Sequence, residues 1–381
     1  MLKKVGNYKF LKEIGEGAFG VVYKVIHEKT QRIYAAKMIK DKEISKEILK
    51  QIFREVEIGK LLKHHNIIKF YEMKKEKENY YLFFEYANGL DLLSFMQKGN
   101  SVPEPLLRKL SRQIVDGIDA VYAKNILHRD IKPSNILITY ESDDKALNNP
   151  SIKICDFGFA RRIENEANEH PQHNLEHNRR MSFIGTPLYS APEILQEKAY
   201  SIKADIWSLG ITIFMMAVGK HPFGAIKNSA LFSKIEKGNY SINRQISLSS
   251  EFFSFINKCL QFDCDQRFTW SELKMHEFLS TEQYTTFNYE EFKSTNQISY
   301  KCSNHSELYY FSSKILYNFN YKLINTKAGA SISNNSEIPC QLNNQLKKKK
   351  RNVNLKLQKV VSIPLLNHRY KNFIGINQSQ K

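Results

Sequence analysis

The stretch His-Arg-Asp-Ile-Lys-Pro-Ser-Asn, residues 128–135, decides how the rest of the chain is interpreted. It places a carboxylate, an ammonium group and an amide close together in the sequence. Asp130 can accept a proton from a hydroxyl, and Lys132 can face an anionic group. Asn135 can offer its amide oxygen to Mg²⁺. Together these three side chains indicate chemistry at a phosphate group.

Two more motifs accompany this loop. Asp156-Phe157-Gly158 supplies a second carboxylate, which is a hard oxygen ligand for a metal ion. Far upstream, a glycine-rich stretch separates two segments that alternate apolar and polar residues. Its residues are Gly15, Glu16, Gly17, Ala18, Phe19 and Gly20. Because glycine lets backbone N–H groups approach phosphate oxygens, this stretch predicts a hairpin whose turn binds phosphate.

The order and spacing of these motifs resemble the eukaryotic protein kinases over residues 8–279. The resemblance implies an α+β fold of two lobes, with a small β-rich N-lobe at residues 8–86 and a larger helical C-lobe at residues 90–279. It also implies ATP and Mg²⁺ as cofactors and proteins as substrates. Thr186, with Lys132, resembles the serine/threonine rather than the tyrosine kinases. The alternative is a pseudokinase that acts as a binding scaffold, but such proteins usually lack one of the catalytic groups present here.

The catalytic groups implied by the resemblance come from both lobes. Lys37 would bind the α- and β-phosphates of ATP. Glu55 would pair with Lys37 from a helix that the apolar spacing predicts over residues 45–63. The other catalytic residues would be Asp130, Lys132 and Asn135. The metal ligands would be Asn135 and Asp156.

The resemblance also assigns the contacts of the nucleotide. Val22 and Ala35 would cover the adenine from above, and Leu137 would form its floor. Phe84 would close the back of the pocket, and the backbone of Glu85 and Ala87, in the hinge between lobes, would hydrogen-bond the adenine. The carboxylate of Asp91 would take the ribose hydroxyls.

Gly59 departs from the family pattern, because relatives place a bulky side chain at this position of the spine that links the lobes. Two outcomes are open. The missing side chain leaves a void between Phe70 and Phe157, which would weaken the Lys37–Glu55 pair, or Phe70 reaches across and closes the space.

The segment between Asp156 and Glu193 is longer than is usual in this family. Its insertion carries three histidines whose spacing could hold zinc, but Pro171 and the polar flanks favour a loop instead. The histidines are His170, His173 and His177. Ser182 falls at the activating phosphorylation site of similar kinases. The pocket that receives its phosphate would be formed by Arg129 and Arg161. Farther on, Arg267 should pair with Glu193.

Residues 280–381 form a basic C-terminal tail, expected to be partly disordered, with 15 Lys and Arg against 5 Asp and Glu. Nine basic residues and no acidic ones lie in residues 347–371. A solvated tail is the simplest interpretation. The alternatives left open are an import receptor at Lys347–Arg351, an anionic membrane, a regulatory protein, or inhibition of the chain's own kinase domain.

The bulk composition narrows the class of protein further. The chain has 381 residues, 42% of them hydrophobic, and five scattered cysteines without metal-site spacing, which suit a reducing compartment. The longest apolar run, residues 206–218, is too short to span a bilayer. We therefore expect a soluble protein of the cytoplasm, with the nucleus left open. The excess of basic residues lies mostly in the tail, and no specific nucleic-acid partner is expected.

Overall fold

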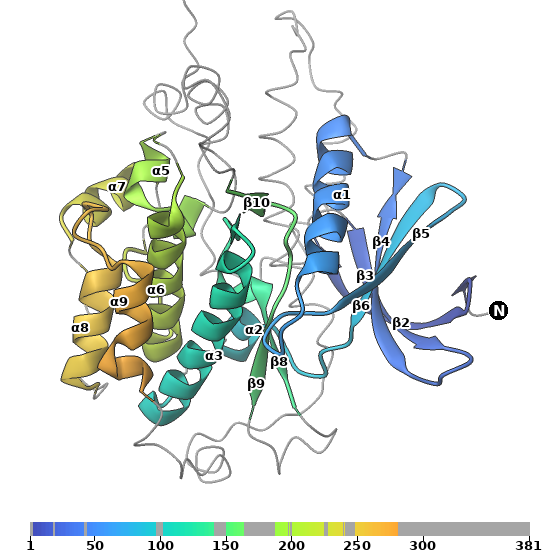
Figure 1. Cartoon of the computed structure of the whole chain (residues 1–381), viewed down its shortest axis with the longest axis horizontal. Helices are drawn as coiled ribbons and strands as arrows, with labels where there is room; N and C mark the ends of the chain where they lie inside the picture. The colour runs from blue at the N-terminus through green and yellow to red at the C-terminus, as the bar shows by residue number, and fades with distance from the viewer. Residues whose placement is uncertain are drawn as a thin grey trace, which may run out of the picture.

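The computed structural model describes residues 3–17, 20–41, 44–96, 102–140, 150–163, 187–196, 198, 200–224, 228–238, 240 and 248–280. These residues form two lobes, one built on a twisted antiparallel sheet and one built mainly of helices (Figure 1). The predicted two-lobed α+β fold is confirmed. Among the described helices, none is long and apolar enough to cross a membrane.

The N-lobe is a six-stranded sheet with strand order β1-β2-β3-β4-β6-β5. Its strands are β1 (Lys4–Val5), β2 (Tyr8–Gly17), β3 (Gly20–His27), β4 (Ile33–Lys40), β5 (Phe70–Glu76) and β6 (Asn79–Glu85). The predicted hairpin is β2 and β3, which pair antiparallel. The register sets Val22 opposite Lys37 and Ala35 opposite Phe84, so the residues predicted to contact the nucleotide come from neighbouring strands.

Helix α1 (Lys46–Leu61) packs on one face of this sheet (Figure 1). Ser45 begins it, because its hydroxyl accepts the Ile48 N–H at 3.3 Å and satisfies a donor that the first turn leaves free. The helix buries an apolar stripe against residues of β4, β5 and β6. That stripe is Ile48, Ile52 and Val56. Burial of the stripe sets the rotation of the helix and turns Glu55 toward the sheet.

The C-lobe surrounds helix α6 (Ile202–Val218), which is buried on nearly all sides and stands among the other helices in Figure 1. The other helices are α2 (Leu92–Met96), α3 (Glu104–Tyr122), α5 (Pro192–Leu195), α7 (Asn228–Glu236), α8 (Ser250–Cys259) and α9 (Trp270–Met275). The 3₁₀ turns are η2 (Pro133–Asn135), η4 (Pro187–Tyr189) and η5 (Glu277–Leu279). Two small sheets pair β7 (Ile126–Leu127) with β10 (Arg161–Arg162) and β8 (Ile136–Thr139) with β9 (Ser151–Ile154).

The segment that leaves β6 is fastened to β8. The side chain of Asn88 pairs with the backbone of Tyr140, accepting its N–H at 2.8 Å and donating to its carbonyl at 3.1 Å. Nearby, the Ile138 N–H donates to the Leu90 carbonyl at 2.7 Å. These bonds hold the predicted hinge against β8, the strand that follows residues 128–135.

Phe70 fills the space beside Gly59. A Cβ atom added at Gly59 would lie 2.8 Å from the Phe70 Cβ and 3.2 Å from its Cγ, closer than side chains pack. The prediction of a void that weakens the Lys37–Glu55 pair is therefore wrong. The alternative prediction, that Phe70 closes the space, is confirmed. The Phe70 ring also meets Phe84 edge-on, with centroids 5.5 Å apart.

Candidate active site

The loop at residues 128–135 is anchored by Asp205 at the start of α6. The buried Asp205 carboxylate accepts the backbone N–H groups of His128 and Arg129, each at 3.0 Å. It also accepts the hydroxyls of Tyr122 at 3.1 Å and Tyr200 at 2.7 Å. Because four donors share one fully buried carboxylate, the backbone of the loop has little freedom.

Asp130 lies in this loop and contacts Lys132 and Asn135, the two side chains predicted to act with it. Lys132 Nζ is 2.6 Å from Asp130 Oδ2. Asn135 Nδ2 donates to the same oxygen at 2.9 Å and to the Asp130 carbonyl at 2.8 Å. Since the amide nitrogen of Asn135 makes both bonds, its amide oxygen remains for a cation.

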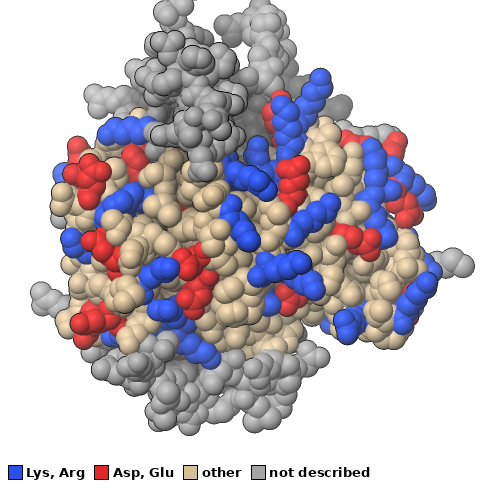
Figure 2. Space-filling view, in the orientation of Figure 1, with Lys and Arg blue, Asp and Glu red and all other residues tan. Residues whose placement is uncertain are grey.

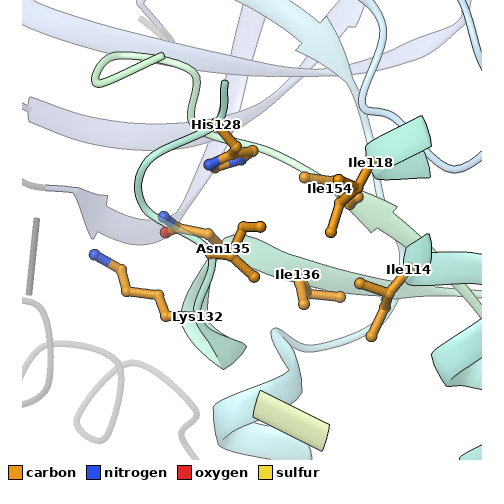
Figure 3. A pocket seen from close by; sticks show the side chains of 8 residues that line it. Ile114, Ile118, His128, Lys132, Asn135, Ile136 and Ile154 are labelled. Atoms are coloured by element: carbon orange, nitrogen blue, oxygen red, sulfur yellow. The ribbon is translucent and has the colours of Figure 1, made fainter. Parts of the chain in front are cut away.

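A small apolar pocket lies beneath this loop. Its polar edge is formed by His128, Lys132 and Asn135, and Figure 3 shows their side chains on one side of it. The opposite wall consists of isoleucines from α3, β8 and β9 that pack under the loop. They are Ile114, Ile118, Ile136 and Ile154. This apolar floor supports the polar groups from below.

Two residues of the site have backbone conformations that side chains other than glycine rarely adopt. Arg129 has φ of 68° and Asp156 has φ of 63°. Such conformations cost about 1–3 kcal/mol each and persist only where the surroundings impose them. For Arg129 the bond to Asp205 does so, and for Asp156 the neighbouring Phe157 is buried against His128, with ring centroids 4.9 Å apart.

The predicted pair of Lys37 and Glu55 is present. Lys37 Nζ lies 2.8 Å from Glu55 Oε2 and 3.1 Å from Oε1, and both side chains are almost fully buried. Burial disfavours the charge of Lys37, but the carboxylates of Glu55 and Asp156 outweigh it and hold its pKa above the usual value. Lys37 therefore presents a permanent positive charge between the lobes.

Asp156 is kept ionised by its neighbours. Burial favours the neutral acid, but the positive charges of Lys37 and Lys132 hold the pKa of Asp156 below its usual value. An ionised carboxylate at Asp156 and an amide oxygen at Asn135 are the hard oxygen donors that Mg²⁺ prefers. The donor set at these two residues therefore fits Mg²⁺.

Four apolar residues predicted to enclose adenine remain partly exposed between the lobes. Their neighbours on the same strands, such as Ala36, Ile136 and Ile138, are buried. The partly exposed four are Val22, Ala35, Phe84 and Leu137. A planar apolar ligand would cover surface that the fold leaves open.

Two residues that were predicted to contact the nucleotide, Glu85 and Asp91, also make contacts within the protein. Glu85 pairs with Lys153 of β9 at 2.7 Å, and its other oxygen accepts the Lys69 N–H at 3.2 Å. Asp91 begins α2, because its carboxylate accepts both the N–H and the hydroxyl of Ser94. The capping role of Asp91 was not anticipated from the sequence, and its ribose contact stays a prediction. Ala87 lies between them in the hinge and is partly exposed.

The glycine-rich hairpin is described as far as Gly17 and again from Gly20, with Gly15 and Glu16 in β2. At Gly20 the structure adds a reason for glycine, because a Cβ there would lie only 2.0 Å from the Met38 carbonyl oxygen. The close approach of β4 thus requires glycine independently of any phosphate. Ala18 and Phe19 lie outside the described residues.

The predicted pair of Glu193 and Arg267 is present and bidentate. Arg267 donates to the two carboxylate oxygens of Glu193 at 2.8 and 3.0 Å, and its side chain is fully buried. A buried pair of this kind fixes α5 against the segment before α9 and leaves an unpaired charge if one partner is removed.

Arg129 and Arg161 lie close enough to influence each other, together with a third guanidinium from α1. Burial and then the charge of Arg161 lower the pKa of Arg54. Burial chiefly, with Arg161 and Arg54 contributing, lowers the pKa of Arg129. Arg54 was missed at the sequence level, although its place directly before Glu55 was a usable signal. Ser182 and the three histidines lie outside the described residues.

Comparison with known proteins agrees with this geometry. The family model described as the protein kinase domain matches residues 8–279, so the chain belongs to the protein kinase family. It is 34% identical over 286 residues to calcium-dependent protein kinase 5 of Plasmodium berghei, which covers 74% of this chain and 47% of that protein. It is 35% identical over 279 residues to the probable serine/threonine-protein kinase MARK-A of Dictyostelium discoideum, covering 73% and 24%.

A third relative is serine/threonine-protein kinase ATG1a of Arabidopsis thaliana, 31% identical over 278 residues, which are 72% of this chain and 42% of that protein. The chain spans less than half the length of each of these three relatives. All three are kinases, and two carry serine/threonine in their names. The likeness supports a eukaryotic serine/threonine kinase without assigning a subfamily.

Proposed function

We propose that the chain is a serine/threonine protein kinase that transfers the γ-phosphate of ATP to hydroxyl groups of proteins. The observation that carries this proposal is the assembled set of catalytic groups. Lys37 pairs with Glu55 at 2.8 Å, and Asp130 is held by Lys132 and Asn135. Asp156 lies near enough to Lys37 and Lys132 for their charges to lower its pKa. A pseudokinase scaffold usually lacks at least one of these groups.

The side chains have separate tasks in the proposed reaction. Asp130 accepts the proton of the substrate hydroxyl as the new O–P bond forms and the bond to the leaving ADP breaks. Lys132 places positive charge beside that carboxylate and offsets charge on the transferred group. Lys37, oriented by Glu55, holds the phosphates that leave with ADP. Bound Mg²⁺, held by Asn135 and Asp156, would neutralise phosphate charge.

Identification of the phosphorylated residue tests the proposed class of acceptor. The full-length protein would be incubated with γ-labelled ATP and an acceptor protein, and the labelled sites located by mass spectrometry. Label on serine or threonine is expected. Label confined to tyrosine would contradict the assignment, and a protein that binds ATP without transferring label would be the scaffold instead.

We propose further that phosphate on Ser182 activates the enzyme by binding the cluster of Arg54, Arg129 and Arg161. Burial chiefly, and then the charge of Arg161, lower the pKa of Arg54 and of Arg129, so like charges lie near one another in the cluster. A phosphate would add about −2 charge and relieve that repulsion. Arg161 is held beside the catalytic loop by pairing with Leu127, while Arg54 precedes Glu55 on α1. The phosphate would thus stabilise the position of α1 from which Glu55 reaches Lys37.

Ser182→Ala is expected to lower kcat/KM about tenfold or more, because charge-assisted hydrogen bonds contribute about 1.5–3 kcal/mol each. Arg54→Gln should lower kcat/KM by the same factor in protein phosphorylated on Ser182. In the Ser182→Ala background it should lower kcat/KM only slightly. Activity assays on the two single variants and the double variant, with Ser182 phosphate measured by mass spectrometry, check this. Full activity without Ser182 phosphate would contradict the regulatory role.

For the tail we propose binding to an anionic partner or restraint of the kinase domain through Lys347–Lys371, and a cytoplasmic location with the nucleus as the alternative. The support is charge alone. Residues 347–371 carry nine basic residues, whereas Lys and Arg intermix with Asp and Glu on the face of the kinase domain in Figure 2. Residues 347–371 therefore differ in charge pattern from the face of the kinase domain seen in Figure 2.

Truncation after Ser280 keeps η5, in which the carbonyls of Glu277 and Phe278 accept hydrogen bonds from Arg108. If the tail restrains or tethers the kinase, the truncated protein should differ from the full chain in activity or location, and the difference should shrink as salt rises. Full-length protein with Lys347–Arg351 changed to Gln is the matched control. Identical kinetics and distribution of all three proteins would leave only an inert tail.

A further inference from the structure

The 3₁₀ turn η4 (Pro187–Tyr189) packs on helix α6, the helix that also holds the loop of Asp130. Burial chiefly, and then the charge of Asp130, raise the pKa of Tyr189. Ser208 of α6 donates its hydroxyl to the Tyr189 carbonyl at 2.8 Å. The same helix holds the catalytic loop through Asp205. Helix α6 is therefore the common base that sets the position of η4 relative to Asp130.

A second side chain fastens η4 from beyond the end of α6. The helix ends at Val218, Gly219 caps it, and His221 follows two residues later. His221 Nε2 lies 2.7 Å from the Leu188 carbonyl oxygen. On the opposite side of the ring, Nδ1 accepts the backbone N–H of Phe223 at 3.2 Å. Phe223 is itself fully buried and stacks on Trp207 of α6.

These two bonds determine the tautomer of His221. Since Nδ1 accepts a hydrogen bond, the ring proton lies on Nε2, which donates to Leu188. Burial lowers the pKa of His221 to about 4, so the ring stays neutral at physiological pH. Leu188 is 39% exposed although its carbonyl is fixed, so η4 presents an apolar side chain at a defined place relative to α6.

We propose that His221 is a positioning residue for the protein substrate. By donating a hydrogen bond to the Leu188 carbonyl, His221 holds η4 in one position. In that position η4 forms a fixed surface that contacts a polypeptide whose hydroxyl reaches Asp130. The inference rests on the proposed kinase function. It predicts an effect on the binding of the protein acceptor and none on the binding of ATP, because the Lys37–Glu55 pair and the hinge lie in other elements.

The matched variants are His221→Asn and His221→Gln in the full chain. The Asn side chain can replace Nδ1 as the acceptor for Phe223 but cannot reach Leu188, whereas the Gln amide can donate at about the reach of Nε2. With dephosphorylated casein as acceptor, we expect His221→Asn to raise the KM for casein about tenfold, as loss of one hydrogen bond of about 1–1.5 kcal/mol implies. The KM for ATP should not change. His221→Gln should restore the KM for casein.

Amide hydrogen exchange of residues 187–191 gives a readout that does not depend on activity. Exchange should accelerate in His221→Asn and stay near wild type in His221→Gln, with equal melting temperatures. The proposal is overturned if the two variants show the same exchange, or if His221→Asn changes the KM for ATP as much as that for casein. A wild-type protein that transfers no phosphate to any acceptor would refute the proposed function instead, while the exchange measurement would still judge His221.

Discussion

Replacing Lys37 with Met, or Asp156 with Asn, is expected to lower kcat by about 10²- to 10³-fold while the fold survives. Removal of one group that stabilises charge in the transition state typically costs about 3–4 kcal/mol. Lys37 lies between two carboxylates that hold its pKa high, and Asp156 carries the negative charge that would hold Mg²⁺. Steady-state phosphate transfer at saturating ATP and acceptor measures the loss.

Lys40→Met is the matched control, since Lys40 is exposed at the end of the same strand, β4. It should retain activity near wild type. Melting temperatures of all variants separate lost chemistry from lost structure. Lys37→Met or Asp156→Asn keeping more than about a tenth of wild-type kcat would count against the roles assigned here.

Gly59→Leu is expected to lower activity about tenfold or more and to destabilise the protein by about 1–3 kcal/mol, as overpacking does. The added Cβ alone would lie 2.8 Å from the Phe70 Cβ, so α1 or β5 must move. Because Glu55 lies one turn earlier on α1, this movement would draw its carboxylate away from Lys37. Activity of the unphosphorylated protein and its thermal unfolding together measure the effect.

Lys60→Leu introduces the same side chain one residue farther along α1, at an exposed position, and should change little. If Gly59→Leu instead raised basal activity, the spine between the lobes would have room to fill, and the packing of Phe70 described here would be contradicted. That outcome would support the prediction of a void beside Gly59, which the sequence left open.

The catalytic loop, the ionised Asp156 and the pair Lys37–Glu55 could be predicted because their spacing along the chain carries the geometry. Helix α1 was predictable for a different reason, since its apolar period of 3.6 residues determines which face is buried and therefore where Glu55 points. In these segments the residues that determine the local fold are also the site residues or their sequence neighbours. The local sequence pattern was therefore sufficient to predict both.

The remaining features depend on contacts between distant residues, which no local pattern encodes. Closure of the space beside Gly59 required knowing where the Phe70 ring lies, and the sequence left both outcomes open. Asp91 was assigned only a ligand, but its carboxylate also starts α2. Arg54 and His221 gain their importance from partners more than thirty residues away, such as Leu188 for His221.

The most direct test of the central claim compares wild-type protein with Asp130→Asn in transfer of γ-labelled phosphate to a protein acceptor. Asn preserves the shape of the side chain but cannot accept the hydroxyl proton. The account predicts transfer to serine or threonine by wild type and a loss of about 10²-fold or more in Asp130→Asn, with ATP binding retained. Equal transfer by both proteins, or none by wild type with ATP bound, would contradict it.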